Sequence, residues 1–248
     1  MATHALRGCA LLFLLLGLHG CTGMGYGGTT YHPSDTRRLS VRDYLVNGAH
    51  EAEGYGLYSY VLLKRAPERD DRERVAALLA EYLRAISHRD NVGSEAIDRF
   101  ELNVTYLPVE STPPHAVEAV GAGSTDPETD AAVAWIIRNY DYDRARVMLA
   151  AFEGTEGDGP YLVSQKAAVT TSGADDRYLL QDLSNAEPRL VRLWMKGFLQ
   201  QVKKERFWDR DTMFSLHLGL RELVAKTGAM VPSVASAVVV LREFAPAH

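Results

Sequence analysis

The sequence predicts a mixed fold of strands and amphipathic helices, of the α+β or α/β class, with a small sheet of about three strands and a helical C-terminal part. Segments with the pattern of a strand alternate with segments of helical period between residues 55 and 165. Helical patterns then fill the remaining chain. Strand direction is not visible in a sequence, so both fold classes remain open.

The first predicted strand covers residues 55–64, where aromatic and aliphatic side chains occupy both faces. This composition is typical of a strand buried on two sides. Pro67 then precedes an amphipathic helix. The apolar side chains of this helix recur at helical spacing: Val75, Leu78, Leu79, Tyr82 and Ile86.

The second predicted strand covers residues 100–106 and shows strict alternation. One face carries Phe100, Leu102, Val104 and Tyr106, and the other carries Glu101, Asn103 and Thr105. Side chains of period two indicate a strand with one apolar face. A third, short strand is predicted at Tyr161–Gln165.

Two loops interrupt the pattern. Residues 108–127 contain paired prolines and several glycines, and this loop is long for a compact domain. Loops of that length are either functional or disordered. Residues 153–160 hold three glycines and form the second predicted loop.

Two helices are predicted between residue 125 and residue 152. Thr125 or Asp126 can cap the first, which ends near residue 138. Asp141 or Asp143 can cap the second, which ends near residue 152. Acidic side chains at the start of a helix accept backbone N–H bonds and interact favourably with the helix dipole, so capping accounts for the pair Asp141 and Asp143.

The C-terminal part carries further helical stripes. They are Leu190, Trp194, Phe198 and Val202 after Pro188, and Met213, Leu216, Leu220 and Leu223 after Asp211. The apolar run from Val231 to Leu241 is interrupted by Pro232 and two serines. It therefore fits a docked C-terminal helix better than a membrane span.

The N-terminal residues have the pattern of an export signal. Arg7 precedes an apolar run over Cys9–Leu18, which is too short to span a bilayer permanently. The run ends in Leu18-His19-Gly20-Cys21, which resembles the lipobox of bacterial lipoproteins. The resemblance implies a signal peptide over residues 1–20, cleavage before Cys21, and acylation of Cys21 with diacylglycerol and palmitate.

The resemblance also implies a location. Thr22 follows the acylated cysteine, which favours the outer membrane of an exported protein facing the periplasm. Residues 21–38 are rich in Gly, Thr, Ser and Tyr and read as a flexible tether. Residues 39–248 then form a single globular domain with the long loop near 108–127.

Composition excludes several classes of chemistry. Of the two cysteines, Cys9 lies in the signal and Cys21 is lipidated, so cysteine nucleophiles, thiolate metal sites and disulfides are not expected. The formal charge is −5 and becomes more negative when Arg7 is removed, which disfavours nucleic acid as a partner. We expect no cofactor and no metal, because phosphate-binding glycine motifs are missing and His50-Glu51 lacks the second histidine of a zinc helix.

Candidate site residues are few. His50, Glu51 and Asp158 are the candidate catalytic groups, since histidine and carboxylate side chains can exchange protons with a substrate. Tyr140, Tyr142 and Tyr161 are candidate binding residues, because tyrosines in or near loops can recognise protein or glycan surfaces.

Two functions follow from the sequence. The preferred one is a non-catalytic, envelope-anchored lipoprotein that binds another envelope protein or the cell wall through the loops at 108–127 and 153–160. Its membrane contact is the bilayer, through acylated Cys21. The alternative is a lipid-anchored hydrolase acting on peptidoglycan or another envelope polymer, using groups that only the fold brings together.

Overall fold

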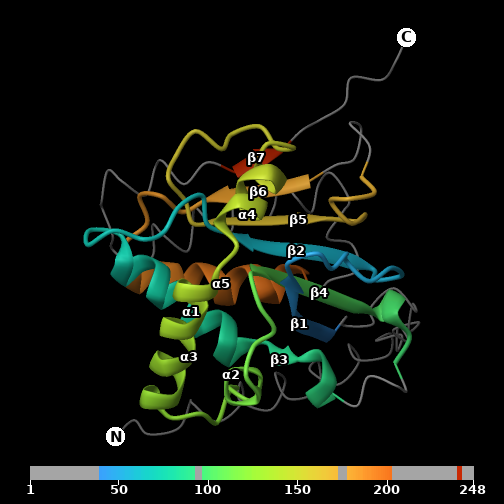
Figure 1. The fold of residues 1–248 in the computed structure, drawn as a ribbon. Helices are drawn as coiled ribbons and strands as arrows, with labels where there is room; N and C mark the ends of the chain where they lie inside the picture. Colours follow the sequence, from blue (N-terminus) through green and yellow to red (C-terminus); the bar gives the residue numbers. More distant parts are fainter. Residues whose placement is uncertain (1–38, 93–96, 173–177, 203–238, 242–248) are drawn as a thin grey trace, which may run out of the picture. The chain divides into compact units, whose positions relative to one another are not determined.

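A computed structural model describes residues 39–92, 97–172, 178–202 and 239–241, which belong to one compact unit, Thr36–His248. The described residues form a seven-stranded sheet with the order β3-β1-β4-β2-β5-β6-β7 (Figure 1). The strands are β1 (Leu39–Val46), β2 (Leu57–Leu62), β3 (Ser87–His88), β4 (Leu102–Val109), β5 (Tyr161–Gln165), β6 (Tyr178–Asp182) and β7 (Val239–Leu241). The prediction of a small sheet of about three strands is therefore wrong.

Strand direction divides the sheet into two parts. Strands β3, β1, β4 and β2 run parallel to one another. Strands β5, β6 and β7 are added at the β2 side, each antiparallel to its neighbour. The sheet is thus mixed and, with helices between the strands, gives an α/β fold.

Three of the additional strands, β1, β6 and β7, have sequences that do not show a strand pattern. In β1, Arg42 and Asp43 interrupt the apolar pattern of Leu39–Val46. β6 has five residues and ends in Gln181-Asp182, inside the part predicted to be helical, so that prediction is wrong there. Val239–Leu241 forms β7 and not the end of a C-terminal helix. The predicted stripe from Met213 to Leu223 lies outside the described residues.

The helices are α1 (Arg72–Ala85), α2 (His115–Glu118), α3 (Asp126–Asn139), α4 (Tyr142–Leu149) and α5 (Pro188–Val202), with short 3-10 helices at Arg89–Val92 and Arg99–Glu101. Helix α1 packs against both α3 and α5 (Figure 1). The predicted helix after Pro67, the two helices after residue 125 and the helix after Pro188 are confirmed. In α5 the predicted stripe residues Leu190, Trp194 and Phe198 are buried.

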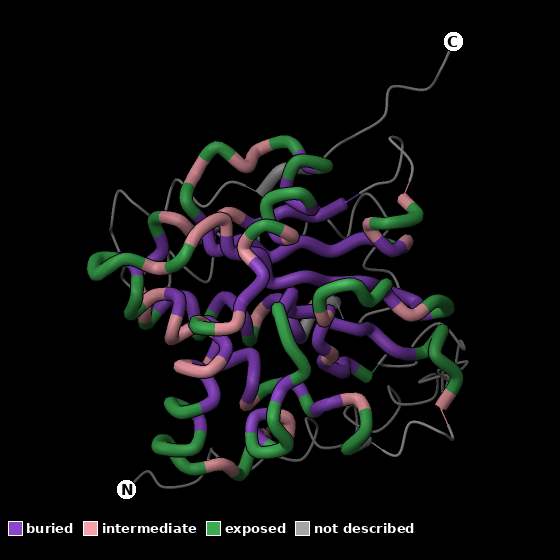
Figure 2. Tube along the Cα trace, in the orientation of Figure 1, coloured by how far each residue is buried: buried purple, intermediate pink, exposed green. Residues whose placement is uncertain are grey.

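Both faces of the central strands are buried (Figure 2). All six residues of β2 are buried, as its composition predicts. All eight residues of β4 are also buried, although the sequence alternates. Asn103 and Thr105 are buried like the apolar residues of the strand, and α1 lies against β4, where the Tyr82 hydroxyl donates to the Thr105 carbonyl at 3.1 Å. Polar side chains therefore do not mark an exposed face in this strand.

Helix caps occur where the sequence predicts them. The Thr125 side chain accepts from the Glu128 backbone N–H, and the Glu128 carboxylate accepts from the Thr125 N–H at 2.8 Å, which makes a complete capping box for α3. The Asp141 carboxylate accepts from the Arg144 N–H at 2.9 Å and caps α4. The capping residues are therefore Thr125 and Asp141, not Asp126 and Asp143.

The long connection between β4 and α3 is ordered by the core. It contains α2, and Val117 and Val120 within it are buried. The carbonyl oxygens of Glu118 and Val120 each accept a hydrogen bond of 2.6 Å from the Arg42 guanidinium. A buried cation in β1 therefore fixes this segment against the sheet.

Residues 47–56, here called the crossing segment, connect β1 to β2 across one face of the sheet. At its start the Asn47 N–H donates to the carbonyl of Val109, at the end of β4. At its end the Gly56 N–H donates to the carbonyl of Leu102, at the start of β4. The crossing segment therefore runs the length of β4. Residues of the crossing segment line the candidate site described below.

Candidate functional site

Tyrosine hydroxyls from the sheet hold the crossing segment in place. The Tyr106 hydroxyl accepts from the Ala52 N–H at 3.0 Å. The Tyr58 hydroxyl donates to the Ala52 carbonyl at 3.1 Å and accepts from the Tyr55 N–H at 3.2 Å. The backbone groups of Ala52 and Tyr55 have no partner strand, so they hydrogen-bond to these tyrosine hydroxyls instead.

Glu51 is the buried carboxylate of the crossing segment, with only 6% of its surface exposed. Its Oε1 accepts from the Tyr60 hydroxyl at 3.3 Å, and its Oε2 accepts from the Thr170 hydroxyl at 2.7 Å. The Tyr60 hydroxyl also accepts from the Val169 N–H at 3.0 Å. Glu51 and Tyr60 therefore join the crossing segment to residues 166–171, which follow β5.

The tyrosines beneath the site remain protonated. Burial, together with the nearby Glu51 carboxylate, raises the pKa of Tyr60 far above its ordinary value. Burial also raises the pKa of Tyr106, whose ring stacks on Tyr60 with centroids 6.1 Å apart. Both phenols therefore act as fixed hydrogen-bonding groups over the physiological pH range.

A pocket of about 660 Å³ opens between the crossing segment and residues 166–171. Its lining residues are His50, Glu51, Glu53, Gly54, Tyr55, Tyr58, Lys166, Ala167, Ala168, Thr170 and Thr171. Tyr58 lies opposite Gln165 in the register of β2 and β5, so this pocket is at the start of β2 and the end of β5. Its volume is in the range of small-molecule sites, which is roughly 300–1,000 Å³.

A second pocket, of about 540 Å³, lies at the carboxyl ends of β1 and β4. It is lined by Asn47, Gly48, Ala49, His50, Glu110, Asp141, Asp143, Arg144 and Val147. Arg144 donates to the carbonyls of Val46 and Ala49, and Asp141 caps α4, so two of its charged groups already have structural partners. In the described part of the chain, no group of three His, Cys, Asp or Glu side chains is placed to hold a metal ion.

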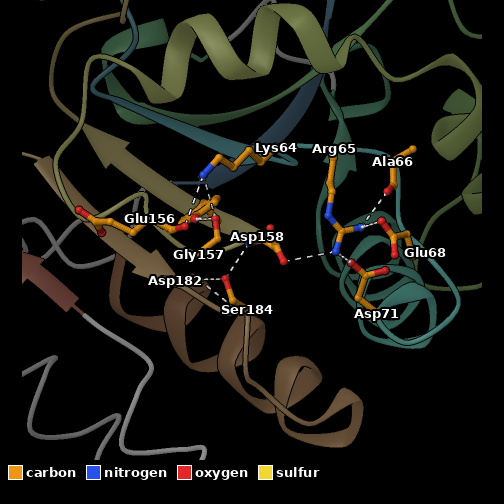
Figure 3. A network of polar contacts seen from close by, with 12 residues as sticks. Lys64, Arg65, Ala66, Glu68, Asp71, Glu156, Gly157, Asp158, Asp182 and Ser184 are labelled. Atoms are coloured by element: carbon orange, nitrogen blue, oxygen red, sulfur yellow. Dashed lines mark hydrogen bonds and ion pairs between the residues drawn. The ribbon is translucent and has the colours of Figure 1, made fainter.

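The structure separates the three candidate catalytic residues. His50 lines both pockets and Glu51 lines the larger one. Asp158 lies just before Tyr161, which pairs with Leu62 at the end of β2, whereas the larger pocket is at the start of β2. The Asp158 carboxylate is mostly exposed and lies 3.4 Å from the Arg65 guanidinium (Figure 3). Asp158 is thus not part of the pocket that holds Glu51.

The second predicted loop is fixed by internal contacts. The Lys64 ammonium donates to the carbonyls of Thr155 at 3.0 Å and Gly157 at 3.2 Å (Figure 3). The Ser184 hydroxyl accepts from the Gly159 N–H at 2.6 Å. These contacts hold residues 153–160 against the ends of β2 and β6, and none of these residues lines either pocket.

The three candidate binding tyrosines serve the fold. Tyr140 is fully buried, and its hydroxyl donates to the Val61 carbonyl and accepts from the Leu63 N–H. Tyr161 is fully buried and donates to the Gly157 carbonyl. Tyr142 is partly buried and donates to the carbonyl of Ile137 at 2.8 Å. Each hydroxyl therefore satisfies a backbone carbonyl.

Sequence reasoning missed the residues that line the pocket with Glu51 or hydrogen-bond to it. Tyr58 and Tyr60 sit on one face of β2 at strand spacing, but such tyrosines are equally common in ordinary cores. Lys166 and Thr170 follow β5 and carry no motif. Only the pairing of β2 with β5 brings them to the crossing segment.

Comparison with known protein families, curated proteins and solved structures finds no match to this chain. The described part of the chain contains no helix that is both long and apolar enough to span a bilayer.

Proposed function

We propose that this protein is an envelope-anchored lipoprotein, and that its folded part is a non-catalytic binding or accessory module for another envelope protein or the cell wall. The anchor is supported by the lipobox Leu18-His19-Gly20-Cys21, which lies outside the described residues. Acylated Cys21 holds the chain in the bilayer, on the periplasmic side of the outer membrane. The bilayer and one envelope component are its partners.

The larger pocket is the observation that supports binding. It combines a buried carboxylate, two tyrosine rings and exposed polar side chains in a volume suited to a small ligand or a polymer end. Glu51 accepts hydrogen bonds from the hydroxyls of Tyr60 and Thr170, so it is oriented before any ligand arrives. Such pre-orientation favours recognition because little freedom is lost on binding.

The hydrolase alternative has one favouring observation, which is that His50 and Glu51 line the same pocket. Acid–base chemistry needs two such groups within hydrogen-bond reach of the substrate. Among the described residues, however, Glu51 bonds to hydroxyl groups and not to His50. The binding module therefore remains the preferred function, and His50 and Glu51 are the pair to test.

The anchor is tested by metabolic labelling with palmitate. The wild-type chain should incorporate the label, and Cys21→Ala should lose it and accumulate as the uncleaved precursor. Labelling of Cys21→Ala at the wild-type level would refute the anchor.

The binding function is tested with the full chain purified in detergent and mixed with isolated sacculi or with solubilised envelope proteins. We expect retention by one of the two, reduced in Glu51→Gln and unchanged in Glu73→Gln, an exposed glutamate of α1 outside both pockets. No soluble sugar or peptide fragments should be released. Fragment release that His50→Ala and Glu51→Ala abolish without lowering the melting temperature would establish the hydrolase instead.

A further inference from the structure

Two opposite charges in the larger pocket form no ion pair within the described part of the chain. Glu53 and Lys166 both line it and are both exposed. Neither the Glu53 carboxylate nor the Lys166 ammonium makes an ion pair with any described residue. Arg99 lies beside the crossing segment, where its guanidinium donates to the backbone carbonyl of Glu53 at 3.3 Å and not to the carboxylate. Among the described residues, the pocket therefore presents a carboxylate and an ammonium group, neither of them in an ion pair, to one occupant.

The two charges come from different walls. Glu53 belongs to the crossing segment, on the same side as the buried carboxylate of Glu51. Lys166 is the first residue after β5 and belongs to the facing wall of residues 166–171. One wall thus offers carboxylates and the other an ammonium group.

The surface between the charges suits a small, mainly apolar backbone. The rings of Tyr55 and Tyr58 meet edge to face, with centroids 5.9 Å apart, and their small exposed edges line the pocket. The facing wall contributes the short side chains of Ala167 and Ala168, which leave room for an extended chain. The hydroxyl of Thr170 is held by Glu51, and its second hydrogen-bonding position can serve a peptide group.

The geometry points to a dipolar ligand, a short peptide end that carries both a free amino group and a free carboxylate, as the occupant of this pocket. The amino group bonds to Glu51 and Glu53, and the carboxylate bonds to Lys166. A neutral oligosaccharide would cover Lys166 and Glu53 without neutralising either charge, which is unfavourable. This inference rests on the proposed binding function and specifies the chemical class of its ligand.

The test uses the full chain in detergent and four probes measured by calorimetry: trialanine, N-acetyl-trialanine, trialanine amide and chitotetraose. Trialanine should bind, and each blocked form should bind about tenfold more weakly or worse, because each block removes one charged end of the ligand and its charge-assisted hydrogen bonding. Chitotetraose should bind more weakly than trialanine.

Exposed-site variants assign each end of the ligand. Glu53→Gln should reduce the difference in affinity between trialanine and its acetylated form, because the amino group keeps only Glu51 as a carboxylate partner. Lys166→Gln should bind trialanine and its amide equally. Glu101→Gln and Arg69→Gln, which change exposed charges outside the pocket, should behave as the wild type. A structural role for either residue would weaken all probes alike and would not produce this selective pattern.

The outcomes separate the ligand class from the binding function. Equal binding of trialanine and both blocked forms, preference for chitotetraose, or no binding of any probe would overturn the dipolar ligand. Retention on sacculi or envelope proteins that Glu51→Gln weakens would still support the binding module in each of those cases. If Glu51→Gln did not weaken retention on sacculi or envelope proteins, the binding module itself would be refuted.

Discussion

The guanidinium of Arg42, in the centre of β1, donates a 2.7 Å hydrogen bond to the carbonyl oxygen of Leu83, in the last turn of α1. Arg42 is fully buried. It also donates to the carbonyls of Ile86, Glu118 and Val120, so one cation serves the carbonyl ends of α1 and α2. The negative ends of two helix dipoles stabilise this charge in place of a carboxylate.

Replacing Arg42 should be severely destabilising. Arg42→Met leaves three buried carbonyls and the partly buried Glu118 carbonyl without their donor, so we expect the free energy of unfolding to fall by about 3 kcal/mol or more. Chemical denaturation measures this change. Arg84→Met, which removes an ion pair to exposed Asp126, should cost less than about 1 kcal/mol. Equal losses in the two variants would show that Arg42 does not organise the two helix ends.

The pocket wall depends on Tyr60. Tyr60→Phe removes the donor to Glu51 and the acceptor for the Val169 N–H, so the free energy of unfolding should fall by about 1–3 kcal/mol. Ligand retention should weaken as well, because Glu51 loses its orientation. Tyr142→Phe removes one bond far from the pocket and should leave retention unchanged. Unchanged retention in Tyr60→Phe would contradict a pre-oriented Glu51.

The capping box of α3 has a separate test. Thr125→Ala removes the acceptor for the Glu128 N–H, and we expect a loss of about 1 kcal/mol in the free energy of unfolding. Thr112→Ala changes an exposed threonine outside any helix and should change it by less than about 0.5 kcal/mol. Thermal unfolding of both variants makes the comparison, and a smaller loss in Thr125→Ala than in Thr112→Ala would refute the cap.

His88 gives stability a pH dependence. Its ring stacks on Tyr44 with centroids 5.9 Å apart, and burial lowers the pKa of His88 below its ordinary value of 6.5, although Asp43 and Asp90 act in the opposite direction. Below the ordinary pKa the unfolded chain binds a proton that the folded chain binds less readily. Stability should therefore fall as pH drops through 6.5 towards the folded pKa.

The His88 contribution is isolated by difference. The melting temperature of His88→Gln should fall less than that of the wild type when pH is lowered from about 7.5 to about 5.5. His115→Gln, at an exposed position, should retain the wild-type slope. Identical slopes in His88→Gln and the wild type would place the pH dependence elsewhere.

The sequence predicted those elements that depend on neighbouring residues. Strand β5 appears at its predicted bounds, and the caps at Thr125 and Asp141 follow from side chains within three positions of their N–H partners. Strand β1 was missed because Arg42 reads as a polar break, while its partners lie 41 to 78 positions away. The local pattern of apolar and polar residues does not indicate contacts between residues so far apart in the sequence.

The residues of the larger pocket could not be grouped from the sequence for the same reason. Glu51 was a candidate from its residue type, but its partner Thr170 lies 119 positions away. Asp158 was grouped with Glu51 on the same reasoning, and the register of β2 and β5 places them at opposite ends of β2. Tertiary pairing alone decides which polar groups share a pocket.

The most direct test of the account is photo-crosslinking in living cells from Thr171, an exposed residue that lines the larger pocket. A photoreactive side chain there should capture one envelope protein or cell-wall fragment, and capture should fall in Glu51→Gln and when the anchor is removed by Cys21→Ala. The same side chain at Asp130, an exposed position of α3 outside both pockets, should capture much less. Equal capture from Thr171 and Asp130, or capture that Glu51→Gln leaves unchanged, would contradict a binding module that works through this pocket.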